Sequence, residues 1–469
     1  MKMALHLAAS LLVAMGVLVA PVARADGPQR PNIVFILSDD QRFDLLSQMP
    51  NVKSLVMDHG VTFSNSFVTD PLCCPSRATI LRGQYSHTTG IYQVGGPYGG
   101  WKQVNKRHLE NDTIATWLKS VGYTTAFFGK YLNGYGKADY VPPGWDSWNA
   151  FVNEGNMYYN YIESRDGVPV SFGSSTEDYS TDVLSAQVDA YIRSADPNKP
   201  LFVSFDPRAP HFPTIAAPRY VGTTCPLKPP KLNASDWEAD VSDKPAYVQS
   251  YAIPTSPQAT GLWKKQCLAL RATDDAVGVI IQALQDTGRL GNTMIVYGSD
   301  NGLTNTEHRL QGKKSPYESS IRVPLTIRYD AAGTHGTVDP HIVANVDYAE
   351  TFLELAGATA TIPQEGLSLI PLIRGDAGVP WRSDVLIEGY DDPAAPHGGF
   401  YVHTYCAVHT ADSIYVQYVT GEQEFYDLKA DPLELLNRAG DPAYVGQVHA
   451  LHARLVQLCQ PAPPGMVVT

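Results

Sequence analysis

The strongest constraint on the fold is a set of short apolar runs that each stop at polar or ionisable residues. The run at 32–37 (NIVFIL) is rich in β-branched residues and ends at Ser38-Asp39-Asp40. Runs of the same kind end before polar segments at three further places: 122–128, 201–205 and 293–297. A stretch with helical spacing of apolar residues, 268–284, precedes the last of them. Strands that alternate with helices predict a doubly wound α/β layer.

The length of the chain, 469 residues, suits one large domain and a smaller one. Beyond residue 375 short Tyr- and Val-rich runs alternate with turns, and a last helix is expected near 444–459. We therefore expect a main domain over 26–375 and a small α+β domain over 376–469.

The first 25 residues have the pattern of an export signal. Lys2 precedes an apolar run at 11–20, and Ala23-Arg24-Ala25 fits a small-x-small cleavage site. A membrane anchor is the alternative, but the run is short for a bilayer span and Pro21 interrupts it. We expect cleavage and a secreted or periplasmic protein, lysosomal or extracellular if the source is eukaryotic. No later stretch is long and apolar enough for a membrane span.

The charge balance argues against one class of partner. The formal net charge is −12, so a surface that neutralises nucleic-acid phosphates is not expected. An anionic small ligand remains compatible with this charge, because a few local cations or a metal ion can override the global sign.

Six cysteines occur in the chain, and an exported protein permits disulfides. No CxxC pair is present, so a zinc site is not indicated. Cys225 with Cys267, and Cys406 with Cys459, are plausible neighbours, although the sequence leaves the connectivity open.

Two segments carry chemistry that a bare α/β fold does not need. Asp39 and Asp40 follow a predicted buried strand, where open α/β sheets place ligands. One Asp would explain a helix cap, whereas two in succession indicate a cation or another partner. Cys73 stands close to Pro75, Ser76 and Arg77, and a thiol at a helix start near Arg would be reactive. A structural disulfide or a buried thiol are the alternatives.

Cys73-x-Pro75-Ser76-Arg77 resembles the C-x-P-S-R signature of the type I sulfatases. Further blocks of that family occur in the same order along residues 31–440: Asp39-Asp40, Gly122-Tyr123-x-Thr125 through Gly129-Lys130-Tyr131, Asp300-Asn301-Gly302, Lys313 with Tyr317-Glu318 and Arg322-Val323-Pro324, and a C-terminal consensus over 426–437. The ordered set makes a chance match negligible. The resemblance implies an alkaline-phosphatase-like fold, with a large mixed β-sheet flanked by helices and a small C-terminal α+β domain.

The resemblance also implies a mechanism at position 73. A maturation enzyme oxidises the cysteine to formylglycine, whose hydrate is a geminal diol. One hydroxyl attacks the sulfur of a sulfate monoester and expels the alcohol, leaving a covalent sulfo-enzyme. The second hydroxyl then drives sulfate out as the aldehyde reforms, which an ordinary serine could not do.

Roles for the other residues follow from the same resemblance. The metal ligands would be Asp39, Asp40, Asp300, Asn301 and the modified residue 73; their oxygens favour Ca²⁺, with Mg²⁺ as the alternative. Arg77 would orient the diol, and Lys130 and Lys313 would bind sulfate oxygens and the bridging oxygen. His211 would help to protonate the leaving oxygen.

One departure from the arylsulfatase pattern indicates which branch of the family the chain resembles. Leu132 occupies the position of an arylsulfatase histidine, as in the N-acetylglucosamine-6-sulfatase and bacterial arylsulfatase-like branch. We take His308 as a candidate for substrate binding or sulfate elimination.

The expected substrates are carbohydrate or aryl sulfates. The alternatives are a phosphonate monoester or phosphodiester hydrolase, or a sulfated-glycan-binding protein whose Cys73 is never converted.

Overall fold

The computed structural model describes residues 30–153, 157–226, 238–333, 335–392 and 401–469. The predicted export signal lies outside these residues. Among them, no helix combines the length and the apolar character that a membrane crossing requires.

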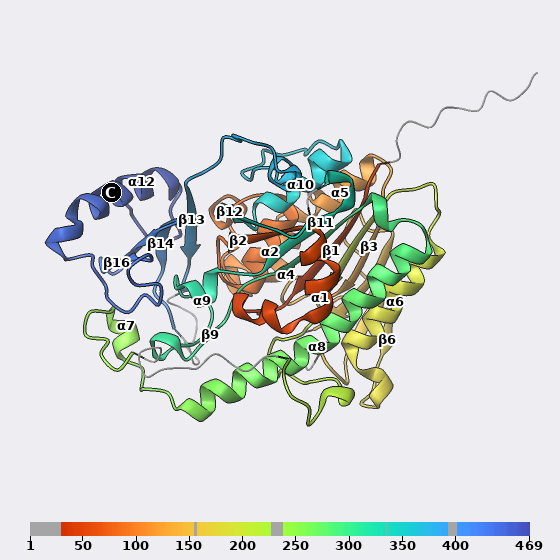
Figure 1. Cartoon of the computed structure of the whole chain (residues 1–469), viewed down its shortest axis with the longest axis horizontal. Helices are drawn as coiled ribbons and strands as arrows, with labels where there is room; N and C mark the ends of the chain where they lie inside the picture. The colour runs from red at the N-terminus through yellow and green to blue at the C-terminus, as the bar shows by residue number, and fades with distance from the viewer. Residues whose placement is uncertain (1–29, 154–156, 227–237, 334, 393–400) are drawn as a thin grey trace, which may run out of the picture.

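A mixed ten-stranded sheet forms the centre of the molecule (Figure 1). The strand order is β12-β2-β11-β8-β1-β7-β3-β4-β5-β6, and β8, β1, β7, β3 and β4 run parallel to one another. The strands span β1 Asn32–Ser38, β2 Val61–Phe67, β3 Thr124–Gly129, β4 Ser147–Val152, β5 Ile162–Arg165, β6 Val168–Ser171, β7 Leu201–Asp206, β8 Thr293–Ser299, β11 Leu325–Tyr329 and β12 Thr337–Ala344. All four apolar runs singled out in the sequence form strands of this sheet.

Helices cover both faces of the sheet. One face carries α2 (Cys73–Arg82), α4 (Gly100–Lys106), α5 (Ile114–Ser120) and α10 (Asp347–Ala356), and the other carries α1 (Pro50–Leu55), α6 (Ser180–Ser194) and α8 (Ser256–Asp286). Successive side chains of β1 alternate between them: Phe35 packs into the first core, and Val34 and Ile36 into the second. This burial on both faces explains why β1 reads as a continuous apolar run.

The C-terminal part forms a separate four-stranded antiparallel sheet, shown in blue in Figure 1. Its strands are β13 (Asp384–Gly389), β14 (Tyr405–Thr410), β15 (Ser413–Tyr418) and β16 (Gln423–Asp427), with α12 (Val445–Leu458) against β14. The alkaline-phosphatase-like prediction of a large mixed sheet and a small C-terminal α+β unit is confirmed, and the boundary at residue 375 stays a prediction.

Shorter elements complete the chain: α3 (Ser86–Thr89), α7 (Ala246–Gln249), α9 (Glu318–Ile321), α11 (Ile370–Arg374), β9 (Thr304–Asn305) and β10 (Gln311–Gly312). Disulfides join Cys225 to Cys267 and Cys406 to Cys459, the two pairs that the sequence suggested. Cys73 and Cys74 are buried and are not joined in a disulfide among the described residues.

Candidate active site

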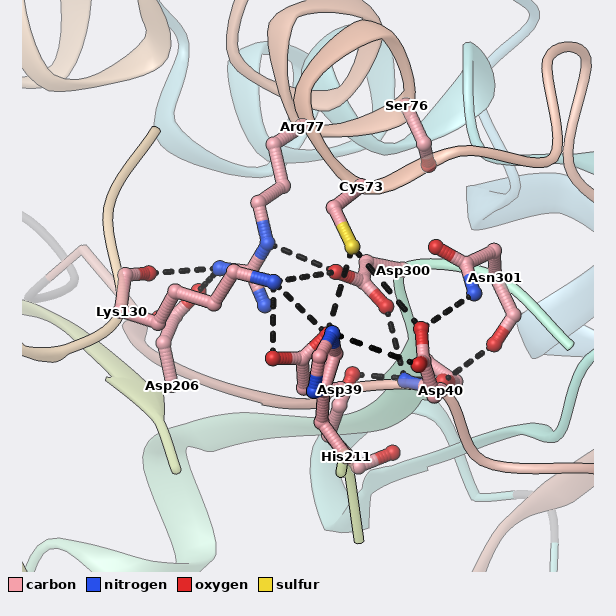
Figure 2. A network of polar contacts seen from close by, with 12 residues as sticks. Asp39, Asp40, Cys73, Ser76, Arg77, Lys130, Asp206, His211, Asp300 and Asn301 are labelled. Carbon is pink, nitrogen blue, oxygen red and sulfur yellow. Dashed lines mark hydrogen bonds and ion pairs between the residues drawn. The ribbon is translucent and has the colours of Figure 1, made fainter. Parts of the chain in front are cut away.

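Four neighbouring parallel strands deliver the site residues to one edge of the sheet. Asp39 and Asp40 follow β1, Asp300 and Asn301 follow β8, Lys130 follows β3, and Asp206 ends β7. Because parallel strands share the same carboxyl edge, these side chains meet there with Cys73, the first residue of α2 (Figure 2).

Cys73 is buried at the centre of this group. Its Sγ lies 2.6 Å from Lys313 Nζ and 3.5 Å from Asp39 Oδ1. Burial, the largest cause, raises the thiol's pKa to about 12, although Lys130 and Lys313 oppose the shift. Of the three alternatives that the sequence left open for the unmodified residue, the buried thiol fits these observations, since Arg77 is engaged by carboxylates and burial disfavours the thiolate.

The two adjacent carboxylates are held ionised by cations. Burial by itself raises the pKa of Asp39, but Lys130, His211 and Arg208 overcome it and hold the pKa well below its ordinary value. Lys130 Nζ donates to Asp39 at 2.7 Å, and Arg208 Nη1 donates to it at 3.0 Å. The pKa of Asp40 is lowered in the same way, against burial, by His211 and by Lys313, whose Nζ lies 2.5 Å away.

Arg77 links the remaining acids. Its Nε donates to Asp300 at 2.8 Å, and its Nη1 donates to Asp206 at 2.9 Å and to the Lys130 carbonyl at 2.6 Å. Burial raises the pKa of Asp300, and it raises the pKa of Asp206 to about 7 even though Arg77 opposes it. A glycine is needed next to Lys130: a Cβ on Gly129, whose φ is +122°, would lie 2.0 Å from the Asp206 carbonyl oxygen.

His211 reaches the same cluster from the loop after β7. Its Nε2 lies 3.5 Å from Asp40 Oδ2, and its Nδ1 lies 2.7 Å from the Phe212 carbonyl oxygen. A bond from Nδ1–H to that carbonyl would leave the Nε2 lone pair directed into the site. Burial, the largest cause, lowers the pKa of His211 to about 4, so the imidazole is neutral at pH 7 in this state.

The group fits a hard divalent cation. Ligand atoms of Asp39, Asp40, Cys73 and His211 lie within 4.8 Å of one another. The buried Oδ1 of Asn301 has no hydrogen-bond partner in the part of the chain that the structure describes, while its Nδ2 donates to Asp40 at 2.7 Å. A buried amide oxygen without a donor, next to two ionised carboxylates, suits Ca²⁺ or Mg²⁺.

The comparisons with known proteins agree with this geometry. Residues 31–358 match the family model described as sulfatase, and residues 306–461 match the one described as N-sulphoglucosamine sulphohydrolase, C-terminal. The chain belongs to the sulfatase family. The prediction of a sulfuric ester hydrolase is thereby confirmed.

Several sulfatases resemble this one over most of their length. The human N-acetylglucosamine-6-sulfatase is 32% identical over 490 residues, which cover 94% of this chain and 87% of that protein. The N-acetylglucosamine-6-O-sulfatase of Bacteroides thetaiotaomicron is 28% identical, and the alignment covers 89% of this chain and 84% of that protein. A solved structure in complex with its substrate D-glucosamine-2-N,6-O-disulfate has a TM-score of 0.76 at 26% identity, covering 93% of this chain and 99% of that one.

Among the described residues, His308 forms no hydrogen bond or ion pair with Cys73 or with the Asp, Lys and Arg residues around it. Its Nδ1 lies 2.7 Å from Glu238 Oε2, its ring stacks on Tyr317 with centroids 4.0 Å apart, and its Nε2 is 4.0 Å from Glu434. The part of His308 in substrate binding or sulfate elimination stays a prediction. Leu132, the departure noted in the sequence, is buried in the apolar core.

Sequence reasoning missed Asp206 and Arg208. Asp206 neutralises Arg77, and Arg208 pairs with Asp39. Asp206 directly follows the apolar run at 201–205 and Arg208 comes two residues later, so the rule that located Asp39 and Asp300 at strand ends could also have found them.

Proposed function

We propose that this sulfatase hydrolyses the 6-O-sulfate ester of glucosamine residues in sulfated glycans. The likeness to the human N-acetylglucosamine-6-sulfatase, which extends over nearly the whole of both chains, carries this proposal. It uses a formylglycine made from Cys73 by a maturation enzyme, and the disulfides fit an exported protein.

The Sγ of Cys73 marks the place of the formylglycine hydroxyls. The hydrated aldehyde supplies a geminal diol as nucleophile, and a thiol with a pKa of about 12 offers no substitute at neutral pH. Lys313, whose Nζ lies 2.6 Å from that Sγ, is held as an ammonium by Asp40, so it can donate to an ester oxygen.

Asp39, Asp40, Asp300 and Asn301, with residue 73, would hold Ca²⁺, or Mg²⁺ as the alternative. The ion supplies Lewis-acid stabilisation of the sulfate oxygens. Lys130 and Arg208 flank Asp39, and Arg77 fixes Asp300, so the ligand carboxylates are oriented before a substrate enters.

Sulfate release from positional isomers tests the substrate. We expect N-acetylglucosamine-6-sulfate to be hydrolysed with a kcat/KM at least about tenfold above that of the 3-O-sulfate. Cys73→Ala should abolish this activity. Cys74→Ala, in the adjacent buried position, is the matched control and should retain it with some loss of stability. Equal rates on both isomers, or faster cleavage of a phosphonate monoester than of any sulfate ester, would contradict the proposal.

A further inference from the structure

Arg208 makes contact with two different parts of the active site. Its Nη1 donates to Asp39 Oδ2 at 3.0 Å, and its Nη2 donates to the Phe212 carbonyl oxygen at 3.2 Å. The side chain is buried, with an exposed fraction of 7%. A planar guanidinium holds its N–H donors in fixed directions, whereas the ammonium of a lysine is a point charge without that fork. Arg208 therefore fixes the Phe212 carbonyl relative to Asp39.

The Phe212 carbonyl is also the hydrogen-bond partner of His211. The His211 Nδ1 lies 2.7 Å from this oxygen. A carbonyl oxygen accepts hydrogen bonds and cannot donate them, so Nδ1 carries the proton and the lone pair of the neutral ring is on Nε2. Nε2 lies 3.5 Å from Asp40 Oδ2, on the side of the reaction centre (Figure 2). One backbone carbonyl thus selects the ring nitrogen that faces the site.

Other contacts hold the backbone of His211 in place. Tyr158 Oη and the Thr214 amide both donate to the His211 carbonyl, each at 2.9 Å. The ring of Phe212 is exposed, so this residue contributes to the site through its backbone. A change at Arg208 should therefore leave the path of the loop intact and release the Phe212 carbonyl.

We propose that Arg208 is a positioning residue, which anchors the Phe212 carbonyl to Asp39 and thereby keeps His211 in the Nδ1–H tautomer with Nε2 directed at the leaving oxygen of the substrate. Arg208 acts through His211 and does not itself touch the substrate. This inference rests on the proposed function, because it takes His211 as the group that serves the departing sugar alcohol.

The kinetic test uses Arg208→Lys, which keeps a positive charge beside Asp39 but loses the fork that joins the two acceptors. We expect kcat/KM on N-acetylglucosamine-6-sulfate to fall at least about tenfold further than on an aryl sulfate, because a phenol leaves with little protonation. A variant with only a weaker fold or metal site would lose both rates by the same factor. Arg219→Lys is the matched control, at an exposed arginine of the same loop that pairs with Asp182, and should keep the wild-type ratio of the two rates.

A double variant tests whether Arg208 acts through His211. His211→Ala removes the group that Arg208 is proposed to orient. When Arg208→Lys is added to His211→Ala, the ratio of the sugar rate to the aryl rate should therefore stay within about twofold of its value in His211→Ala. A further tenfold fall of that ratio in the double variant would show that Arg208 acts on the leaving group by itself, and would overturn the inference.

The tautomer of His211 gives a readout that does not depend on turnover. In ¹⁵N NMR of the histidine-labelled enzyme at pH 7, the His211 signals are identified by their loss in His211→Ala. We expect a proton on Nδ1 in the wild type and a mixture of the two tautomers in Arg208→Lys. The wild-type spectrum alone still tests the inference if Arg208→Lys fails to fold.

Two results would overturn the part of Arg208: equal losses on the sugar and aryl sulfates in Arg208→Lys, or a wild-type ring that carries its proton on Nε2. Cleavage of an aryl sulfate by the wild type with no cleavage of N-acetylglucosamine-6-sulfate would instead refute the proposed function. The tautomer of His211 in the two proteins would then still decide whether Arg208 positions the ring.

Discussion

At the scale of single residues, burial decides which groups can act. It suppresses the thiolate of Cys73 and lowers the pKa of His211 to about 4, while Asp39 and Asp40 stay ionised only because cations surround them. The Cys-x-Pro-Ser-Arg motif predicts the reactive position, whereas its sequence context left open whether the unmodified thiol is reactive or buried. The thiol's pKa depends on burial, which arises from tertiary packing.

His211→Ala should harm poor leaving groups more than good ones. The negative charge of a bound sulfate ester would favour the protonated imidazole of His211, which is neutral at pH 7 without substrate. A sugar alcohol needs that proton as it departs, whereas a phenol needs little, so we expect a loss of about 10²-fold or more on a sugar sulfate and a smaller loss on an aryl sulfate. Steady-state kinetics on both substrates measure the difference. Equal losses would assign the proton to Lys313, whose Nζ lies beside residue 73.

At the scale of elements, strand ends could be predicted and long-range partners could not. The apolar runs and the polar residues after them located β1, β7 and β8, and with them Asp39 and Asp300. The contacts of His308 could not be predicted, because its partners, Glu238 and Glu434, are 70 and 126 residues away in sequence and no local pattern points to them.

The disulfide between Cys225 and Cys267 ties the loop after β7 to α8 over a separation of 42 residues. Chain-entropy arguments give such a cross-link about 4 kcal/mol of stabilisation. We expect the Cys225→Ser/Cys267→Ser double variant to lose up to that amount of unfolding free energy, measured by denaturant titration. A midpoint equal to that of the wild type would show that the bond adds nothing to stability.

At the scale of the whole molecule, the ionisation of Asp206 in the active site makes the stability of the fold depend on pH. Its folded pKa of about 7 exceeds the ordinary value of 3.8, so the folded protein keeps a proton between about pH 4 and 7 that the unfolded chain releases. The protonated Asp206 contributes on the order of 4 kcal/mol to the free energy of unfolding. This stabilisation is complete below pH 4 and is lost as the pH rises to 7. Asp206→Asn should flatten that decline in thermal unfolding between pH 4.5 and 8. A slope equal to that of the wild type would contradict the assignment.

Metal removal should affect both activity and stability. Asp39, Asp40 and Asp300 meet at one edge of the sheet, and without a cation their mutual repulsion is relieved only by neighbouring Lys and Arg side chains. We expect a calcium-competent chelator to abolish turnover and lower the melting temperature, and Ca²⁺ to restore both. Full activity after exhaustive chelation, verified by elemental analysis, would refute the metal site.

The most direct test of the account is the mass of the peptide that carries residue 73, taken from enzyme of measured activity. The account predicts that this peptide has lost the thiol and gained an aldehyde, and that turnover rises in proportion to the converted fraction across preparations made with and without a maturation system. Fully active protein whose Cys73 is unmodified would contradict it, because the buried thiol then performs chemistry that its pKa of about 12 should prevent.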